Sequence, residues 1–277
     1  GPLAGWTGYG PTIQTVGGLS WLWAFDDGEG PPGSNAIHPD HLAGRVCALG
    51  ALAAVIGRER GCHGAHVEVA QVEALMGTLG DLFLQESVTG GSARPEGNDS
   101  SAGAPWGVFA CSGEETWCVV CVRDDDDWAN LRRAIGNPGW AQDPALETTA
   151  GRLLARDLVN AGVSAWTAER SARDVQDLCQ GAGVPAGRLM HPVEQLEDPH
   201  LEQRGFLVGV DQPGLGSVVL EGACITGSAM AAPVIGPAPF IGQHTRRFCI
   251  DDLGMAATRV EELIRAGALE AVDELPA

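Results

Sequence analysis

Asp40 is the acidic residue whose surroundings most suggest chemistry, because it stands just before a long apolar segment, residues 42–56. Aspartate at such a place is typical of a helix N-cap, where its carboxylate accepts hydrogen bonds from backbone N–H groups. The positive end of the helix dipole also favours the ionised form of a carboxylate. An ionised carboxylate held there can serve as a nucleophile. Asp40 is therefore predicted to be a helix cap, a nucleophile, or both.

Histidine and tyrosine offer weaker candidates. His38 and His41 flank Asp40, but they lie on opposite sides of a helix start. No serine stands in a Gly-x-Ser-x-Gly turn, which argues against a Ser-His-Asp hydrolase. Tyr9 is the only tyrosine and lies between two glycines, where it would either pack in the core or line a cleft.

Two clusters resemble metal sites without matching one. Cys118 and Cys121 lie in a strand-like segment with no second pair at zinc spacing, so they are predicted to be core thiols. The run of four acids at residues 124–127 is typical of a solvated helix start, which favours that interpretation over a metal cluster. No metal is predicted. The eight cysteines are scattered, most of them in apolar segments, and indicate free, buried thiols in a reducing compartment, so a cytoplasmic location is expected.

The charge balance limits the partners. The chain has 17 basic and 36 acidic residues, a formal net charge of −19. Nucleic acids and anionic membrane surfaces would repel this charge, so neither is expected as a partner. The sequence predicts no apolar stretch of membrane-spanning length, and it shows no signal-peptide pattern.

The periodicity of the sequence predicts the elements that would position these residues. The apolar segment 42–56 predicts a helix that ends at Arg58, Arg60 and Gly61, and its apolar character all round predicts burial. A loop rich in small residues covers 90–105. Strands are predicted over 66–70, 106–111, 117–123, 184–189, 206–211 and 217–225, and helices over 71–86, 128–135, 152–161, 171–180 and 258–269.

Five short motifs, in order along nearly the whole chain, resemble motifs that recur in the sequences of the family III CoA-transferases. None is specific alone, and their order carries the resemblance. The motifs are Gly-Pro, Gly-Tyr and Gln-x-x-x-Gly-Leu within residues 1–19, Asp-x-x-x-Gly at 40–44, Ala186-Gly187, Asp198-Pro-His-Leu with Arg204-Gly205, and Gly242-Gln-His-Thr.

The resemblance implies an activity. In that family the Asp of Asp-x-x-x-Gly, here Asp40, attacks an acyl-CoA thioester, forms a mixed anhydride and then an aspartyl-CoA thioester, and a carboxylic acid accepts the CoA. Coenzyme A is a substrate there, and no bound cofactor is needed. Tyr9 and Gly10 become candidates for CoA binding. The family's racemases carry a His-Asp pair that aligns with Tyr9 and Gly10, so this chain favours transfer over racemisation.

The resemblance also implies an α/β fold, with a large Rossmann-like CoA-binding domain, a small α/β domain and a ring-like homodimer. Residues 1–95 and 226–277 would belong to the large domain, 96–196 to the small one, and 197–225 to a linker. The family's N-terminal part is expected to be absent from this chain, and residues 61–65 depart from the family's usual turn. Trp21, Trp23 and Phe25 suggest an apolar acyl group or simple core packing. A racemase or isomerase, and a non-catalytic subunit or truncated paralogue, remain alternatives.

Overall fold

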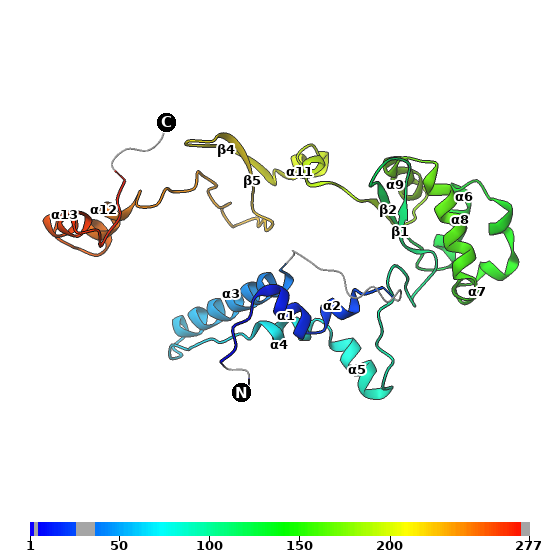
Figure 1. The fold of residues 1–277 in the computed structure, drawn as a ribbon, viewed down its shortest axis with the longest axis horizontal. Coiled ribbons are helices and arrows are strands. Elements are labelled where there is room, and N and C mark those ends of the chain that lie inside the picture. Colours follow the sequence, from blue (N-terminus) through cyan, green and yellow to red (C-terminus); the bar gives the residue numbers. More distant parts are fainter. Residues whose placement is uncertain (3–4, 26–36, 273–277) are drawn as a thin grey trace. The chain divides into compact units, whose positions relative to one another are not determined.

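The structure is a computed structural model that describes residues 1–2, 5–25 and 37–272. The chain divides into two compact units, Gly1–Leu189 and Met190–Ala277. Helices and strands both occur, so the fold is α/β as predicted (Figure 1). The finer division at residues 95, 196 and 225 stays a prediction.

The first part of unit 1 is helical. Two short helices occur within residues 1–39, where the sequence predicts none, and a long one follows at the predicted place. The helices are α1 (Gly10–Val16), α2 (Leu19–Leu22), α3 (His38–Glu59), α4 (Gln71–Gly77) and α5 (Gly80–Val88).

Helix α3 lies where the sequence predicts a helix, which confirms that prediction. The predicted burial of this helix is wrong. Its last residue is Glu59 and its C-cap is Arg60, and Gly61 follows with a φ of 92°, a conformation that favours glycine. Only 6% of its most apolar window is buried within this chain. The exposed apolar side chains of the helix are those of Val46, Leu49, Leu52, Val55 and Ile56.

The length of α3 also differs from the expectation that no apolar stretch is long enough to span a membrane. The helix has 22 residues and contains an 18-residue stretch with a mean hydropathy of 1.3, which gives it the length and composition of a membrane-spanning helix. The helix extends past the apolar segment at both ends, which accounts for the added length. Core helices of water-soluble proteins satisfy the same criterion, so length and composition alone do not separate the two cases.

Two predictions between residues 66 and 86 are wrong in detail. Residues 66–70 form no strand, although the alternation is real: Val67 and Val69 are half-buried while their neighbours are exposed. The segment packs against α3 without a neighbouring strand. The predicted helix 71–86 is broken, and the hydroxyl of Thr78 donates to the carbonyl of Leu75 at 2.7 Å. Such a side-chain bond competes with the helical backbone pattern, and α5 starts two residues later.

The second part of unit 1 is built on a three-stranded antiparallel sheet in the order β1 (Trp106–Ala110), β2 (Trp117–Cys121), β3 (Ala186–Arg188). All three strands were predicted. Phe109 of β1 pairs with Cys118 of β2, and both side chains are buried. Val108 and Val119 alternate with them and are exposed, so one face of the sheet carries the core.

Helices cover that face of the sheet. Trp128, Val159 and Val175 are fully buried in one cluster with the strand residues, each from a different helix. The predicted helix 152–161 is divided at Ala155, and the helices predicted over 128–135 and 171–180 are confirmed. The elements are α6 (Asp125–Ala134), two 3₁₀ turns (Gly139–Gln142 and Pro144–Glu147), α7 (Thr149–Leu154), α8 (Arg156–Ala168) and α9 (Ala172–Gly181).

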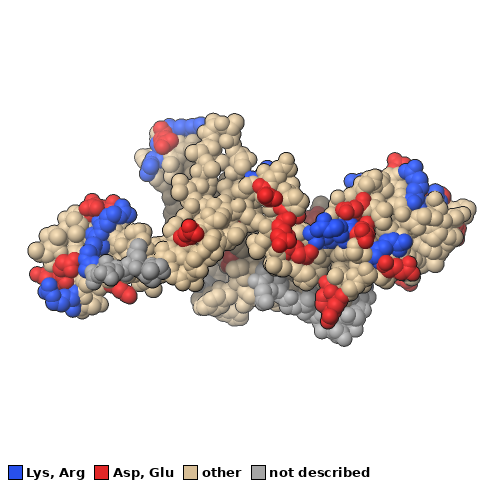
Figure 2. All heavy atoms as spheres, turned by 90° about the horizontal axis from the view of Figure 1, so that it is seen from above, with Lys and Arg blue, Asp and Glu red and all other residues tan. Residues whose placement is uncertain are grey.

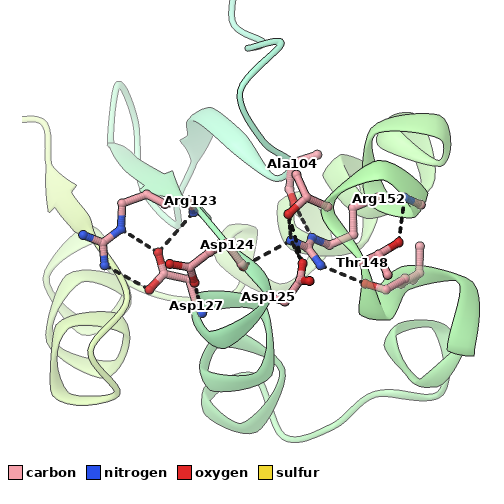
Figure 3. Close-up of polar contacts among 10 residues, drawn as sticks. Ala104, Arg123, Asp124, Asp125, Asp127, Thr148 and Arg152 are labelled. Atoms are coloured by element: carbon pink, nitrogen blue, oxygen red, sulfur yellow. Dashed lines mark hydrogen bonds and ion pairs between the residues drawn. The ribbon is translucent and has the colours of Figure 1, made fainter.

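The acids at residues 124–127 have three different roles, so a solvated helix start describes them only in part (Figure 3). Asp124 caps α6 by accepting from the backbone N–H of Asp127 at 2.8 Å. Asp127 is buried, and Arg123 holds it with Nε at 2.7 Å and Nη2 at 3.0 Å. Among the described residues, no group of three His, Cys, Asp or Glu side chains is arranged to hold a metal ion.

Asp125 pairs with the fully buried Arg152, whose guanidinium lies 5.5 Å from the centre of the Trp128 ring. Figure 3 shows the guanidinium between the start of α6 and the segment that carries Ala104. It joins four parts of the chain. Its hydrogen bonds run to Ala104 O at 3.0 Å, Leu146 O at 3.0 Å, Asp124 O at 3.1 Å, Asp125 Oδ1 at 3.0 Å and Thr149 Oγ1 at 2.8 Å.

The Arg123–Asp127 pair predicts a pH-dependent stability. Hydrogen bonds from Arg123 hold the pKa of the Asp127 carboxyl below its ordinary value. A carboxyl with a lowered folded-state pKa stabilises the fold above its unfolded-state pKa, and this contribution is lost as the pH falls through the folded-state pKa. We expect Asp127→Asn to lower the free energy of unfolding by about 1–2 kcal/mol at neutral pH. Urea denaturation should show the difference disappearing in acid.

Asp126→Asn is the matched control, because Asp126 is exposed in the same turn of α6. It should match the wild type at every pH. A difference between Asp127→Asn and wild type that persists unchanged in acid would contradict the ion-pair explanation.

Unit 2 has a smaller core. Its strands β4 (Leu207–Gln212) and β5 (Gly216–Glu221) form a two-stranded antiparallel hairpin, close to the predicted 206–211 and 217–225. The predicted helix 258–269 is confirmed in place, but it ends earlier, at Arg265. The helices are α10 (Pro192–Gln195), α11 (Pro199–Arg204), α12 (Thr245–Arg247), a π-helical turn (Phe248–Asp252) and α13 (Ala257–Arg265).

The cysteines are all free, but only part of them are core thiols. Cys118 and Cys179 lie in the core cluster, where burial raises the pKa of Cys118 to about 12 and that of Cys179 to about 11. Thiols with such values stay protonated and unreactive at neutral pH. Cys47, Cys62 and Cys224 are exposed, contrary to the general expectation of burial. Figure 2 shows one face of the molecule, where uncharged surface covers wide areas between small groups of charged side chains.

Candidate active site

Asp40 lies in the first turn of α3 without being its cap. The N-cap position is Ile37, and no side chain caps the helix. The backbone N–H of Asp40 donates to the carbonyl of Ile37 at 3.1 Å. An acid in the first turn still interacts favourably with the helix dipole. The side chain of Asp40 is half-buried, so it is available for contacts other than capping.

Two residues contact the two carboxylate oxygens of Asp40. The side-chain amide of Gln71, the first residue of α4, donates from Nε2 to Oδ1 at 2.5 Å. Gly10, the first residue of α1, is buried against Oδ2, and a Cβ atom placed on Gly10 would overlap that oxygen. The same Cβ would also lie 2.6 Å from Cγ2 of Ile37. The starts of α1, α3 and α4 therefore meet at this carboxylate.

Of the two predicted CoA-binding residues, the structure brings only Gly10 to Asp40. Tyr9 precedes α1, and its side chain is 75% exposed. Its backbone carbonyl accepts from the N–H of Ile13 at 2.9 Å. Tyr9 is thus not a core aromatic, which was one of its two interpretations. A role for Tyr9 and Gly10 in binding CoA stays a prediction.

The flanking histidines do not relay charge to Asp40 in this structure. His38 packs edge-on against Trp23, with the ring centres 5.3 Å apart. His41, the residue after Asp40 in α3, is exposed. In the part of the chain that the structure describes, the hydrogen-bond partner of the Asp40 side chain is Gln71. Sequence reasoning missed Gln71, because nothing in the local pattern links it to a residue 31 positions away.

Gln14 is a second glutamine of interest in α1. It belongs to the Gln-x-x-x-Gly-Leu motif, is 2% exposed, and its Oε1 has no hydrogen-bond partner in the described structure. Buried polar atoms are usually paired, so this carbonyl is an exception. The sequence had marked Gln14 only as part of the family resemblance.

A cavity of about 490 Å³ opens between α1–α2 and α4–α5. Trp21, Leu82 and Phe83 line it, and Arg94 lies at the same cavity. Of the three aromatic residues that suggested an apolar acyl site, Trp21 alone is part of it: Trp23 contacts His38, and Phe25 lies against Gly97.

Helices α1 and α4 both connect Asp40 with this cavity. Gly10 and Gln71 lie at the carboxylate, and Val16 and Met76, at the other ends of the same helices, line the cavity. At 1.5 Å per residue, each helix spans about 8 Å between the two places. The cavity therefore lies about one short helix away from the carboxylate.

Glu86 at the edge of the cavity is held as an anion. Backbone N–H groups of Gly91, Ala93 and Ser92 donate to its carboxylate at 2.5, 3.1 and 3.1 Å. These bonds, those from Gly91 and Ala93 above all, lower the pKa of Glu86 from its ordinary value. Its carboxylate oxygens are engaged, which makes Glu86 a structural anchor of the loop after α5.

The fold and the site define a class: an α/β protein with a half-buried, hydrogen-bonded carboxylate at the start of a long helix. Residues 1–245 match the sequence model of the family described as CoA-transferase family III. The chain therefore belongs to the family III CoA-transferases.

Relatives and solved structures agree. The chain is 34% identical over 275 residues to a probable CoA-transferase of Mycobacterium tuberculosis, covering 95% of this chain and 34% of that protein. It is 30% identical over 256 residues to the succinyl-CoA–D-citramalate CoA-transferase of Chloroflexus aurantiacus, covering 92% and 63%. A CaiB/BaiF family protein from Brucella suis has a similar fold, with a TM-score of 0.76 at 23% identity over 88% of this chain and 62% of that one. The chain thus spans between a third and two thirds of these proteins.

Proposed function

We propose that the protein transfers coenzyme A from an acyl-CoA thioester to a carboxylic acid through a covalent intermediate on Asp40. The supporting observation is the position of Asp40. This chain belongs to the family, and its Asp-x-x-x-Gly aspartate lies half-buried in the first turn of α3. The two carboxylate oxygens contact Gln71 and Gly10. A carboxylate oriented in this way is a competent nucleophile.

The proposed chemistry is two exchanges at one carboxylate. An oxygen of Asp40 attacks the thioester carbonyl carbon, the C–S bond breaks, CoA leaves as a thiolate, and a mixed anhydride of Asp40 and the donor acid is formed. The thiolate then attacks the Asp40 carbonyl carbon, expels the donor carboxylate, and leaves an aspartyl-CoA thioester. The acceptor carboxylate reverses both steps and departs as the new acyl-CoA. Splitting one transfer into such steps is the advantage of covalent catalysis.

Gly10 weighs against the racemase alternative. Racemisation needs a base for the proton next to the thioester carbonyl, and the aligned positions carry Tyr9 and Gly10. A side chain on Gly10 would overlap Asp40 Oδ2, so glycine here fits a carboxylate that is itself the reacting group.

The substrates and the setting are proposed from the relatives and the exposed surface. The Chloroflexus aurantiacus relative is named for succinyl-CoA and D-citramalate, and a further relative, 27% identical over 289 residues, is a formyl-CoA:oxalate CoA-transferase of Afipia carboxidovorans. D-citramalate and oxalate are both small carboxylic acids. We propose that CoA enters as a substrate, with no bound cofactor, in the cytoplasm. A homodimer is proposed because the apolar side chains of α3 are exposed in the single chain.

Exchange of ¹⁸O tests the proposal without changing any residue. The purified protein is incubated with succinyl-CoA and [¹⁸O]succinate, or with formyl-CoA and [¹⁸O]formate, and digested for mass spectrometry. When labelled acid opens the aspartyl-CoA thioester and CoA returns to its acyl carbon, one heavy oxygen remains on Asp40. We expect label in the peptide containing Asp40 and none in the peptide containing Asp81. Acyl exchange without label on Asp40 would exclude the aspartyl intermediate.

A further inference from the structure

We propose that Gln71 is a catalytic residue that donates from its amide Nε2 to Oδ1 of Asp40 throughout the reaction. The inference rests on the proposed function and adds a role that the sequence motifs do not assign. Its starting point is the 2.5 Å hydrogen bond between α4 and α3, the contact that engages an Asp40 oxygen with a donor side chain in the described structure.

The backbone around Gln71 is held from both sides. Before it, Val67 packs so closely on Gly50 of α3 that a Cβ on that glycine would lie 2.8 Å from the valine. After it, the fully buried Leu75 packs on Gly17 at the end of α1, where a Cβ would lie 2.6 Å from the leucine. These close approaches, one in the segment before α4 and one within α4, fix the start of the helix, so the Gln71 amide is preorganised toward Asp40.

The two oxygens of Asp40 are thereby made unequal. Gln71 donates to Oδ1, whereas Gly10 lies close against Oδ2 and has no side chain that could donate to it. When Oδ2 forms the bond to the acyl carbon, Oδ1 becomes the carbonyl oxygen of the anhydride and keeps its donor. The thiolate then attacks the Asp40 carbonyl carbon, the C–S bond forms, and the electron pair moves onto Oδ1. Collapse of this adduct breaks the bond to Oδ2 and releases the donor acid.

Charge therefore develops on the oxygen that Gln71 already contacts. A donor placed where an oxyanion forms is the arrangement that stabilises tetrahedral intermediates in acyl transfer. Removing one such donor lowers the rate of the chemical step by about 10²–10³-fold. The hydrogen bond of the Gln71 side chain runs to Asp40, so we expect the affinity for acyl-CoA to change little.

The test compares Gln71→Leu with wild type in single-turnover quench experiments, using succinyl-CoA or formyl-CoA, whichever exchanges more ¹⁸O. Mass spectrometry follows the aspartyl-CoA thioester. We expect its maximal rate of formation to fall about 10²-fold, with the half-saturating acyl-CoA concentration and the melting temperature near those of wild type. Gln85→Leu is the matched control: it removes the amide donor that Gln85, an exposed residue of α5, offers to Ser92 O at 3.3 Å.

The outcomes are distinguishable. Thioester in wild type with an undiminished rate in Gln71→Leu overturns the role of Gln71 and leaves the proposed function standing. A rate lost together with the melting temperature or the acyl-CoA affinity would mean that Gln71 is structural, and overturns the inference too. No thioester and no ¹⁸O on Asp40 in the wild type removes the proposed function and this inference together.

Discussion

Asp40→Asn should lower CoA transfer by about 10⁴-fold or more, the loss typical of removing a catalytic nucleophile. The amide cannot attack a thioester to form an anhydride, so the first covalent step is lost. The fold should survive, because the asparagine carbonyl can still accept from Gln71 and the shape of the side chain is kept. Steady-state transfer from succinyl-CoA or formyl-CoA, measured beside thermal denaturation, checks both parts.

Asp81→Asn is the control for Asp40→Asn, because Asp81 is also an acid in the first turn of a helix, α5, and is exposed. It should retain transfer at the level of wild type. Transfer that survives in Asp40→Asn would remove Asp40 from the mechanism, and with it the reason for the geometry at Gly10 and Gln71.

Arg152→Met should produce the largest loss of stability, about 3–5 kcal/mol in the free energy of unfolding. The guanidinium is fully buried and donates to three backbone carbonyls, those of Ala104, Leu146 and Asp124. Methionine fills similar space, yet it leaves these buried acceptors without a donor. Equilibrium urea denaturation, monitored by tryptophan fluorescence, measures the effect.

Two further variants make the Arg152 result specific. Arg152→Lys keeps the charge but loses the planar fork, so it should also be destabilised, since one ammonium cannot reach all these acceptors. Arg133→Met should stay within about 0.5 kcal/mol of wild type, because Arg133 is an exposed arginine of α6. Equal stability of Arg152→Lys and wild type would show that charge alone matters.

The local signals in the sequence determined much of the fold. Short apolar segments located β1, β2, β4 and β5, and the predicted helix 171–180 located α9, where Ser171 is the N-cap and accepts from the N–H of Asp174 at 3.1 Å. The long helix α3 followed from its apolar composition and from Gly61. These signals succeed because helix caps, strand alternation and chain reversals depend on residues close together in the chain.

The local signals failed where distant parts of the chain decide. Val67 and Val69 alternate like a strand, but a strand needs a neighbour to complete its hydrogen bonds, and none lies beside them in the described structure. The composition of α3 predicted burial, but burial depends on what packs against the helix. The four acids at residues 124–127 looked alike in sequence and differ because Arg123 and Arg152 approach them separately.

For the candidate site, the sequence by itself determined Asp40 and its place at a helix start, through the Asp-x-x-x-Gly motif and the apolar segment behind it. Only the tertiary structure decided which side chains meet that carboxylate. Gln71 is 31 residues away along the chain and Gly10 lies on another helix, and neither shares a local pattern with Asp40. Packing of α1 and α4 against α3 brings them together, because a hydrogen bond and a close contact depend on distance in space rather than on separation in sequence.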